Sequence, residues 1–203
     1  IDNATEYVEF NLFYLTEKEF ELLYLCLAYE NIANDIPKKL KEQSLSQEKD
    51  ITKALYTDYS LFKRELHHDL VQQNPDYDAL ELFQKSQKLL DRFLFIFFAE
   101  DRNLLPTNLI FRINQEWRQL QEMRMNISLY DRYKIYFNDL NQGAKVVLPA
   151  FSETRTAQKE EHQIFAYNGG LFKPDEILDH IKIDDELLYR HTQKLSNYDF
   201  QSE

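Results

Sequence analysis

The stretch between positions 106 and 160 holds the residue types that suit contact with DNA phosphates. The whole chain carries a formal net charge of −11, which opposes a role in coating nucleic acid, but this window has 8 bases against 6 acids. Aromatic side chains accompany its cations, which are Arg112, Arg118, Arg124, Arg132 and Lys134. Guanidinium and ammonium groups bind phosphate oxygens, so these five are the candidate DNA contacts. Solvent-exposed cations are the simpler alternative, because six-residue spacing puts Arg112, Arg118 and Arg124 on different faces of a straight helix.

Residues for metal-dependent chemistry are missing from the sequence, and we predict no catalytic, cofactor-binding or metal-binding residue in this chain. A restriction-type nuclease places an acid two positions before a lysine, and no lysine here has one. The adjacent His67 and His68 point to different helical faces, and the other histidines show no ligand spacing with Cys26. The glycines at 143, 169 and 170 do not form a glycine-rich loop for S-adenosylmethionine.

The tetrapeptide Asn74-Pro75-Asp76-Tyr77 is one residue away from the Asn-Pro-Pro-Tyr with which adenine methyltransferases hold a flipped base. That motif follows a buried strand, whereas residues 64–73 form an amphipathic helical pattern. We therefore interpret residues 74–77 as a helix-breaking turn.

These candidates must be positioned by helices, because the chain of 203 residues contains only three Gly and five Pro. The predicted fold class is mainly α, a multi-helix bundle around a central buried helix at about 78–102, with a small irregular or hairpin segment near 145–172. We expect one helical domain over 1–203, made of a helical core (1–140), the irregular or hairpin segment (141–172) and short C-terminal helices (173–203). The central helix is chosen because residues 85–106 concentrate more apolar mass than any other stretch.

Local signals give the expected boundaries. Thr16 to Glu19 reads as a capping box that opens the first helix, and Ser128 and Gly143 mark the start and end of another. The remaining expectations are an extended segment at 7–15, a polar loop at 43–47, helices at 48–73, around 110–120, at 174–180 and at 184–195, and paired strands at 146–151 and 163–167.

Two further features concern the cellular setting. The uncharged apolar run 93–99 is far shorter than the roughly 20 residues of a membrane span. The single cysteine, Cys26, cannot form an internal disulfide, and we expect it to be a small core residue in a reducing cytoplasm. The sequence lacks an initiator Met, so we expect an internal fragment of a larger protein.

Two passages resemble the helical connector region of type IIG restriction–modification enzymes and related phage-defence adenine-specific DNA methyltransferases. The first runs from Gln87 through Leu-Leu-Asp-Arg to Pro106, and the second is Tyr167-Asn-Gly-Gly-Leu-Phe-Lys-Pro174. Segments at 183–188 and 195–200 extend the likeness, which covers nearly all of the chain. The motif residues are Leu90, Asp91, Arg92, Glu100, Asp101, Arg102, Asn168, Gly169 and Gly170.

This resemblance implies a parent enzyme that transfers a methyl group from S-adenosylmethionine to adenine N6 in DNA, and that also cleaves DNA where a Mg²⁺-dependent nuclease domain is present. In that family the nuclease domain precedes this region and the methyltransferase core follows it. The chain would then be a non-catalytic connector between them, with DNA as a partner through the parent enzyme. Asp91, Arg92, Glu100, Asp101 and Arg102 are expected to form paired charges at the edges of the core.

A second hypothesis belongs to another class of function. The chain is also consistent with a helical protein–protein interaction module whose acidic surface binds a basic partner. A glycine-rich cofactor loop and an Asn-Pro-Pro-Phe or Asn-Pro-Pro-Tyr encoded downstream would favour the connector.

Overall fold

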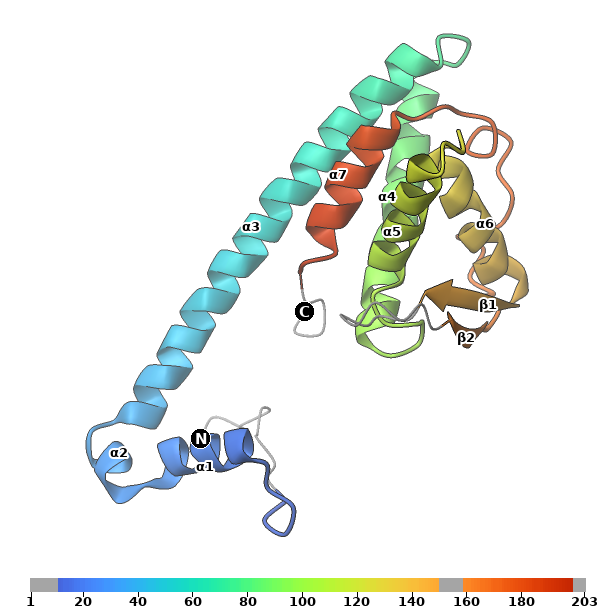
Figure 1. Ribbon diagram of the computed structural model, residues 1–203. Coiled ribbons are helices and arrows are strands. Elements are labelled where there is room, and N and C mark those ends of the chain that lie inside the picture. The colour runs from blue at the N-terminus through green and yellow to red at the C-terminus, as the bar shows by residue number, and fades with distance from the viewer. Residues whose placement is uncertain (1–10, 150–158, 199–203) are drawn as a thin grey trace. The chain divides into compact units, whose positions relative to one another are not determined.

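The computed structural model describes residues 11–149 and 159–198. By its backbone contacts the chain divides into two compact units, 1–53 and 54–203. The elements are α1 (Glu17–Leu27), α2 (Tyr29–Ala33), α3 (Ile36–Gln73), α4 (Ala79–Asp101), α5 (Leu109–Glu122), α6 (Leu129–Gln142), β1 (Ala144–Pro149), β2 (Lys159–Ile164) and α7 (Asp185–Leu195) (Figure 1). The predicted mainly helical fold with one small hairpin is confirmed.

The first unit contains α1, α2 and the beginning of α3. The capping box is confirmed, since the Thr16 hydroxyl accepts from the backbone N–H of Glu19 and the Glu19 carboxylate accepts from that of Thr16. Ala28, with extended backbone, separates α1 from α2. The expected extended segment lies outside the described residues at 7–10, and residues 11–15 form a turn. Cys26 is half-buried rather than part of a core.

The polar loop predicted at 43–47 is wrong, because α3 runs without interruption from Ile36 to Gln73. Residues 38–50 include Lys, Leu, Glu and Gln, which are good helix formers, and no Gly or Pro. Pro37 falls in the first turn, where its missing N–H disrupts no helical hydrogen bond. An exposed helical stretch is as polar as a loop, so polarity alone did not distinguish the two.

The second unit is built around α4, as predicted. Asp78 caps this helix by accepting from the N–H groups of Leu80 and Glu81. Phe93 on α4 lies 6.1 Å from the ring of Phe62 on α3 and 4.9 Å from that of Tyr133 on α6, measured between ring centres. The buried residues of α4 are Leu82, Ser86, Leu89, Leu90, Arg92, Phe93, Ile96, Phe97, Ala99 and Glu100.

The hairpin follows α6, which Gly143 ends at a φ of +79°. β1 and β2 pair antiparallel, with Val146 opposite His162. Each strand begins earlier than predicted, and β2 includes residues 159–162, which precede the second predicted strand. Residues 150–158, which include the last two positions of the first predicted strand, lie outside the described residues. β2 is rich in charged and polar side chains, so a prediction from apolar residues put the start of the second strand later than it is in the structure.

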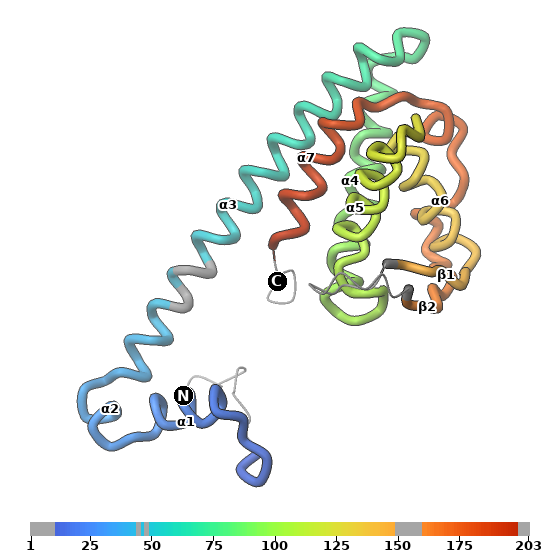
Figure 2. The backbone as a smooth tube through the Cα atoms, in the orientation of Figure 1, coloured from blue at the N-terminus to red at the C-terminus, as the bar shows by residue number. Residues whose placement is uncertain are grey.

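After the hairpin the chain passes along α6 and then enters α7, which lies beside residues 58–69 of α3 (Figure 2). The helix expected at 174–180 is instead a series of hydrogen-bonded turns, in which Asp175 accepts from the N–H groups of Ile177 and Leu178. Among the described residues, only α7 follows as a C-terminal helix. None of the described helices has the length and hydropathy needed to cross a membrane.

Candidate functional site

Arg92 joins the two passages that carry the family resemblance. It lies on α4 with 1% of its surface exposed. Its Nε donates to the carbonyl oxygen of Leu171 and its Nη2 to that of Lys173, both at 3.0 Å. The guanidinium carbon also lies 5.1 Å from the ring centre of Phe137 and 5.9 Å from that of Phe172. Arg92 was expected at the edge of the core and instead lies inside it, where backbone carbonyls and aromatic faces replace water.

Aromatic rings reinforce the same contact. The ring of Tyr167 lies 4.3 Å from that of Phe95 on α4, and Phe172 lies 5.2 Å from Phe95. A Cβ at Gly169 would come within 2.3 Å of the Tyr167 ring, so the absence of a side chain allows this packing. Gly170 has a φ of +79°, a backbone conformation that glycine adopts more readily than other residues, as the Asn-Gly-Gly sequence predicts for a turn. The Asn-Gly-Gly-Leu-Phe segment therefore folds onto α4 as a packed turn.

Glu100 occupies a second buried polar position on α4. It is 7% exposed, and its Oε1 accepts from the backbone N–H of Ile110 at 2.9 Å. Asn108, the N-cap residue of α5, makes no side-chain capping bond, so Glu100 supplies that function from another helix. Burial raises the pKa of Glu100 to about 8, although the hydrogen bond from Ile110 opposes the rise.

The other motif residues on α4 divide between core and surface. Leu90 is 1% exposed, whereas the side chains of Asp91 and Arg102 are exposed and Asp101 is half-buried. Asn168 is exposed at the start of the glycine turn. The expected edge pairing of charges is therefore replaced, at Arg92 and Glu100, by hydrogen bonds to backbone groups inside the core.

Three of the five candidate DNA contacts are engaged by acidic or carbonyl groups of the protein itself. Arg112 is 3% exposed, and its Nη1 donates to Glu160 Oε2 on β2 at 3.0 Å. Arg132 pairs with Glu116 on α5 at 2.5 Å. Lys134 pairs with Asp131 at 2.7 Å and also donates to the carbonyl oxygen of Asp179 at 3.1 Å. These cations contact different elements rather than forming one stripe.

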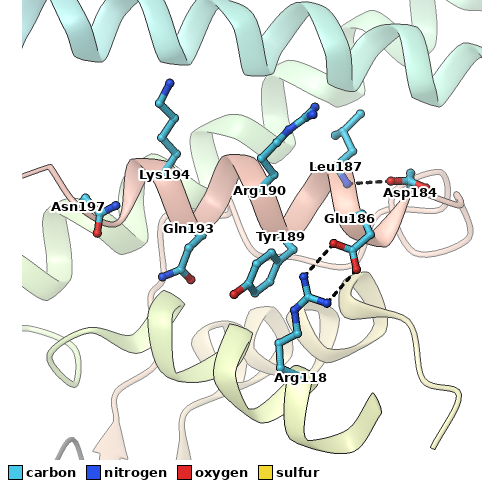
Figure 3. Close-up of a pocket in the computed structure, with 9 residues that line it drawn as sticks. All are labelled: Arg118, Asp184, Glu186, Leu187, Tyr189, Arg190, Gln193, Lys194 and Asn197. Carbon is cyan, nitrogen blue, oxygen red and sulfur yellow. Dashed lines mark hydrogen bonds and ion pairs between the residues drawn. The ribbon is translucent and has the colours of Figure 1, made fainter. Parts of the chain in front are cut away.

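Arg118 reaches from α5 to α7 and closes one side of a groove (Figure 3). Its two terminal nitrogens donate to the two carboxylate oxygens of Glu186 at 3.0 and 2.9 Å, and its guanidinium lies 4.1 Å from the ring centre of Tyr189. The side chain nevertheless remains 43% exposed. The groove has a volume of about 750 Å³ and is lined by Arg118, Asp184, Glu186, Leu187, Tyr189, Arg190, Gln193, Lys194 and Asn197.

The cations of this groove are paired with acids of the same unit. Arg190 lies 2.6 Å from Glu65, and Lys194 lies 2.7 Å from Asp58. By contrast, Arg124 is exposed, has a φ of +60° and forms no ion pair with any other residue in the described ranges. Arg118 and Arg124 are thus the two candidates whose side chains remain accessible.

Two structural polar residues were not found from the sequence. Asn74 is 7% exposed. Its side-chain Nδ2 donates to the carbonyl oxygen of Lys182 at 2.8 Å, and its Oδ1 accepts from the backbone N–H of Lys182 at 2.7 Å. Asp175 binds the ammonium groups of Lys85 and Lys88, each at 2.8 Å. Burial by itself would raise the pKa of Asp175, but the two lysines outweigh it and hold the pKa well below its usual range.

The interpretation of residues 74–77 as a turn agrees with this geometry, because the Asn74 amide is fully engaged by backbone groups.

Within 11–149 and 159–198, no three His, Cys, Asp or Glu side chains are grouped so as to hold a metal ion. Comparisons with family models, curated proteins and solved structures found no match to this chain.

Proposed function

We propose that the chain is a non-catalytic helical connector of a restriction–modification enzyme. The observation that carries the proposal is the pair of hydrogen bonds from Arg92 to Leu171 and Lys173. These bonds join the Leu-Leu-Asp-Arg helix to the Asn-Gly-Gly-Leu-Phe turn, the two passages in which the resemblance lies. Arg92 of the first motif and Gly169 of the second take part in packing, which is the role expected of a scaffold rather than of a catalytic site.

The parent enzyme would methylate adenine N6 in DNA with S-adenosylmethionine, flipping the base out of the duplex to do so. Where a nuclease domain is present, the parent would also cleave DNA with Mg²⁺. The connector would hold these domains in register, in a cytoplasmic setting that suits the free thiol of Cys26.

Direct DNA contact is a separate part of the proposal and involves Arg118 and Arg124. Both have accessible side chains, whereas Arg112 is buried against Glu160. Arg118 would exchange its exposed pairing with Glu186 for a phosphate, an exchange that costs little because surface ion pairs contribute about 1 kcal/mol or less.

The sequence encoded immediately downstream of residue 203 tests the proposal. A connector is followed by a glycine-rich cofactor loop after a predicted strand, and further on by Asn-Pro-Pro-Phe or Asn-Pro-Pro-Tyr. A downstream sequence with neither feature would contradict the assignment to a methyltransferase.

A further inference from the structure

Residues 11–35 display large apolar side chains that the described residues of the first unit leave uncovered. No described residue of the first unit with an assigned exposure is buried, and Phe13 and Tyr29 are 92% and 84% exposed. Exposed apolar side chains at this density mark interaction sites in soluble proteins. The set, called here the 12–32 surface, comprises Leu12, Phe13, Tyr14, Phe20, Leu22, Tyr24, Leu25, Leu27, Tyr29 and Ile32.

The pattern of α1 is typical of a covered helix rather than of a free one. Phe20, Tyr24 and Leu27 follow at steps of four and three residues and therefore share one face. Leu22 and Leu25 extend the apolar character around the helix. A helix that is apolar on nearly all sides is normally buried, yet no residue of α1 is buried.

Local bonds hold this surface in a defined shape. The hydroxyl of Tyr24 on α1 donates to Glu30 on α2 at 2.8 Å, and the Thr16–Glu19 capping box fixes the start of α1. The Asn34 amide donates to the carbonyl of Glu30 at 2.6 Å, which secures the end of α2. The apolar side chains thus project from short helices whose ends are already fixed, so binding need not first order them.

The charges around the surface determine the chemistry of its partner. Between positions 11 and 35 the only base is Lys18, and the acids are Glu17, Glu19, Glu21, Glu30 and Asp35. Glu17 and Glu21 are exposed on α1, one turn apart. A second copy of the chain would bring acids against acids, whereas a partner with a basic rim would be attracted.

We propose that the 12–32 surface is a docking site for an amphipathic helix of a partner protein, with leucine-like residues on one face and lysine or arginine along its edges. Phe20, Tyr24 and Leu27 receive the apolar face of that helix, and Glu17 and Glu21 pair with its basic edge. This binding function goes beyond the connector role, because it requires neither DNA nor a methyltransferase domain.

Binding of designed peptides to the full chain tests the proposal. The probe is a fluorescein-labelled helical peptide of Leu and Lys, about 18 residues or five turns long. The control is a peptide of the same length in which every Lys is replaced with Glu. The Lys peptide is expected to bind, and the Glu peptide is expected to bind at least about tenfold more weakly. Phe20→Ser with Leu27→Ser should weaken the Lys peptide about tenfold or more, while Leu80→Ser with Leu104→Ser, which are 67% and 69% exposed in the second unit, should not.

Charge and self-association complete the test. Glu17→Gln with Glu21→Gln should weaken the Lys peptide and reduce the salt dependence of its affinity. Equal binding of both peptides, binding of neither, or no effect of the Phe20 and Leu27 changes would overturn the proposal. Sedimentation velocity on the unmodified chain tests whether a second copy of the chain occupies this surface. A dimer that Phe20→Ser with Leu27→Ser dissociates would assign the surface to a second copy and overturn the proposal.

Discussion

Single buried polar residues connect parts of the second unit that are far apart in the sequence. Arg92 bonds to residues 171 and 173, and Asn74 bonds to both backbone groups of Lys182. Each of these side chains satisfies backbone groups that have left water. Removing one such side chain leaves its partners buried without hydrogen bonds, which is costlier than losing an exposed contact.

Replacing Arg92 with lysine tests this at the motif itself. A single ammonium group cannot reproduce the two hydrogen bonds that the guanidinium makes to the carbonyls of Leu171 and Lys173. We expect Arg92→Lys to lower the free energy of unfolding by about 2–3 kcal/mol in urea titrations followed by circular dichroism. The matched change Arg102→Lys, at an exposed position of the same motif, should shift it by less than about 0.5 kcal/mol. Similar effects of the two substitutions would rule out the structural role assigned to Arg92.

Glu100 should make stability depend on pH near neutrality. Its pKa rises from 4.5 to about 8 on folding, so the folded state holds a proton that the unfolded state releases. The stabilisation is complete below pH 4.5 and is lost as pH rises through about 8, with an upper limit of about 5 kcal/mol. Glu100→Gln keeps the acceptor for Ile110 and removes the titration. The difference in unfolding free energy between the two proteins should therefore change steadily from pH 5 to about pH 8 and level off above it, and a constant difference would contradict the buried, protonated carboxyl.

At the scale of elements, the glycine turn is shaped by the ring that packs over it. Gly169→Ala should displace Tyr167 from Phe95 and destabilise the second unit by about 1 kcal/mol, since aromatic pairs contribute about that much. In a Tyr167→Ala background the same change should cost almost nothing, because the clashing ring is gone. Thermal unfolding of the two single variants and the double variant measures this coupling. Full additivity would show that Gly169 is needed for another reason.

Helix ends were the part of the fold that could be predicted best. Thr16, Ser128 and Gly143 act where their chemistry indicated, because a cap depends on residues within one turn. The loop at 43–47 and the start of β2 were missed because an exposed helix, a loop and an exposed strand share the same polarity. The burial of Arg92 depends on residues about 80 positions away, and no local pattern contains that information.

The same dependence on residues distant in the sequence explains why the partners of the candidate DNA contacts could not be predicted. The local charge balance singled out the cations, but it does not reveal that Glu160 engages Arg112 or that Glu116 engages Arg132. Glu116 and Glu160 are both counted among the acids between positions 106 and 160, but a count of charges does not say which cation each acid contacts. Those contacts are set by the packing of α5 against β2 and α6.

At the scale of the whole molecule, binding to a labelled DNA duplex as a function of salt separates the accessible arginines from the buried one. Arg118→Gln with Arg124→Gln should reduce the slope of log K against log salt by about 1–2, because each phosphate contact contributes about 0.9. Arg112→Gln should leave the slope unchanged and lower stability instead, since it breaks the contact with Glu160. An unchanged slope in the double variant, or no DNA binding at low salt, would remove both arginines from the interface.

We propose that this chain supports a DNA-modifying enzyme without performing chemistry itself. The most direct measurement is transfer of a tritiated methyl group from S-adenosylmethionine to adenine in mixed-sequence DNA, by residues 1–203 alone and by the full product of the gene. The connector account predicts methylation by the full product and none by residues 1–203. Methyl transfer by residues 1–203 alone, or its absence from the full product, would contradict the account.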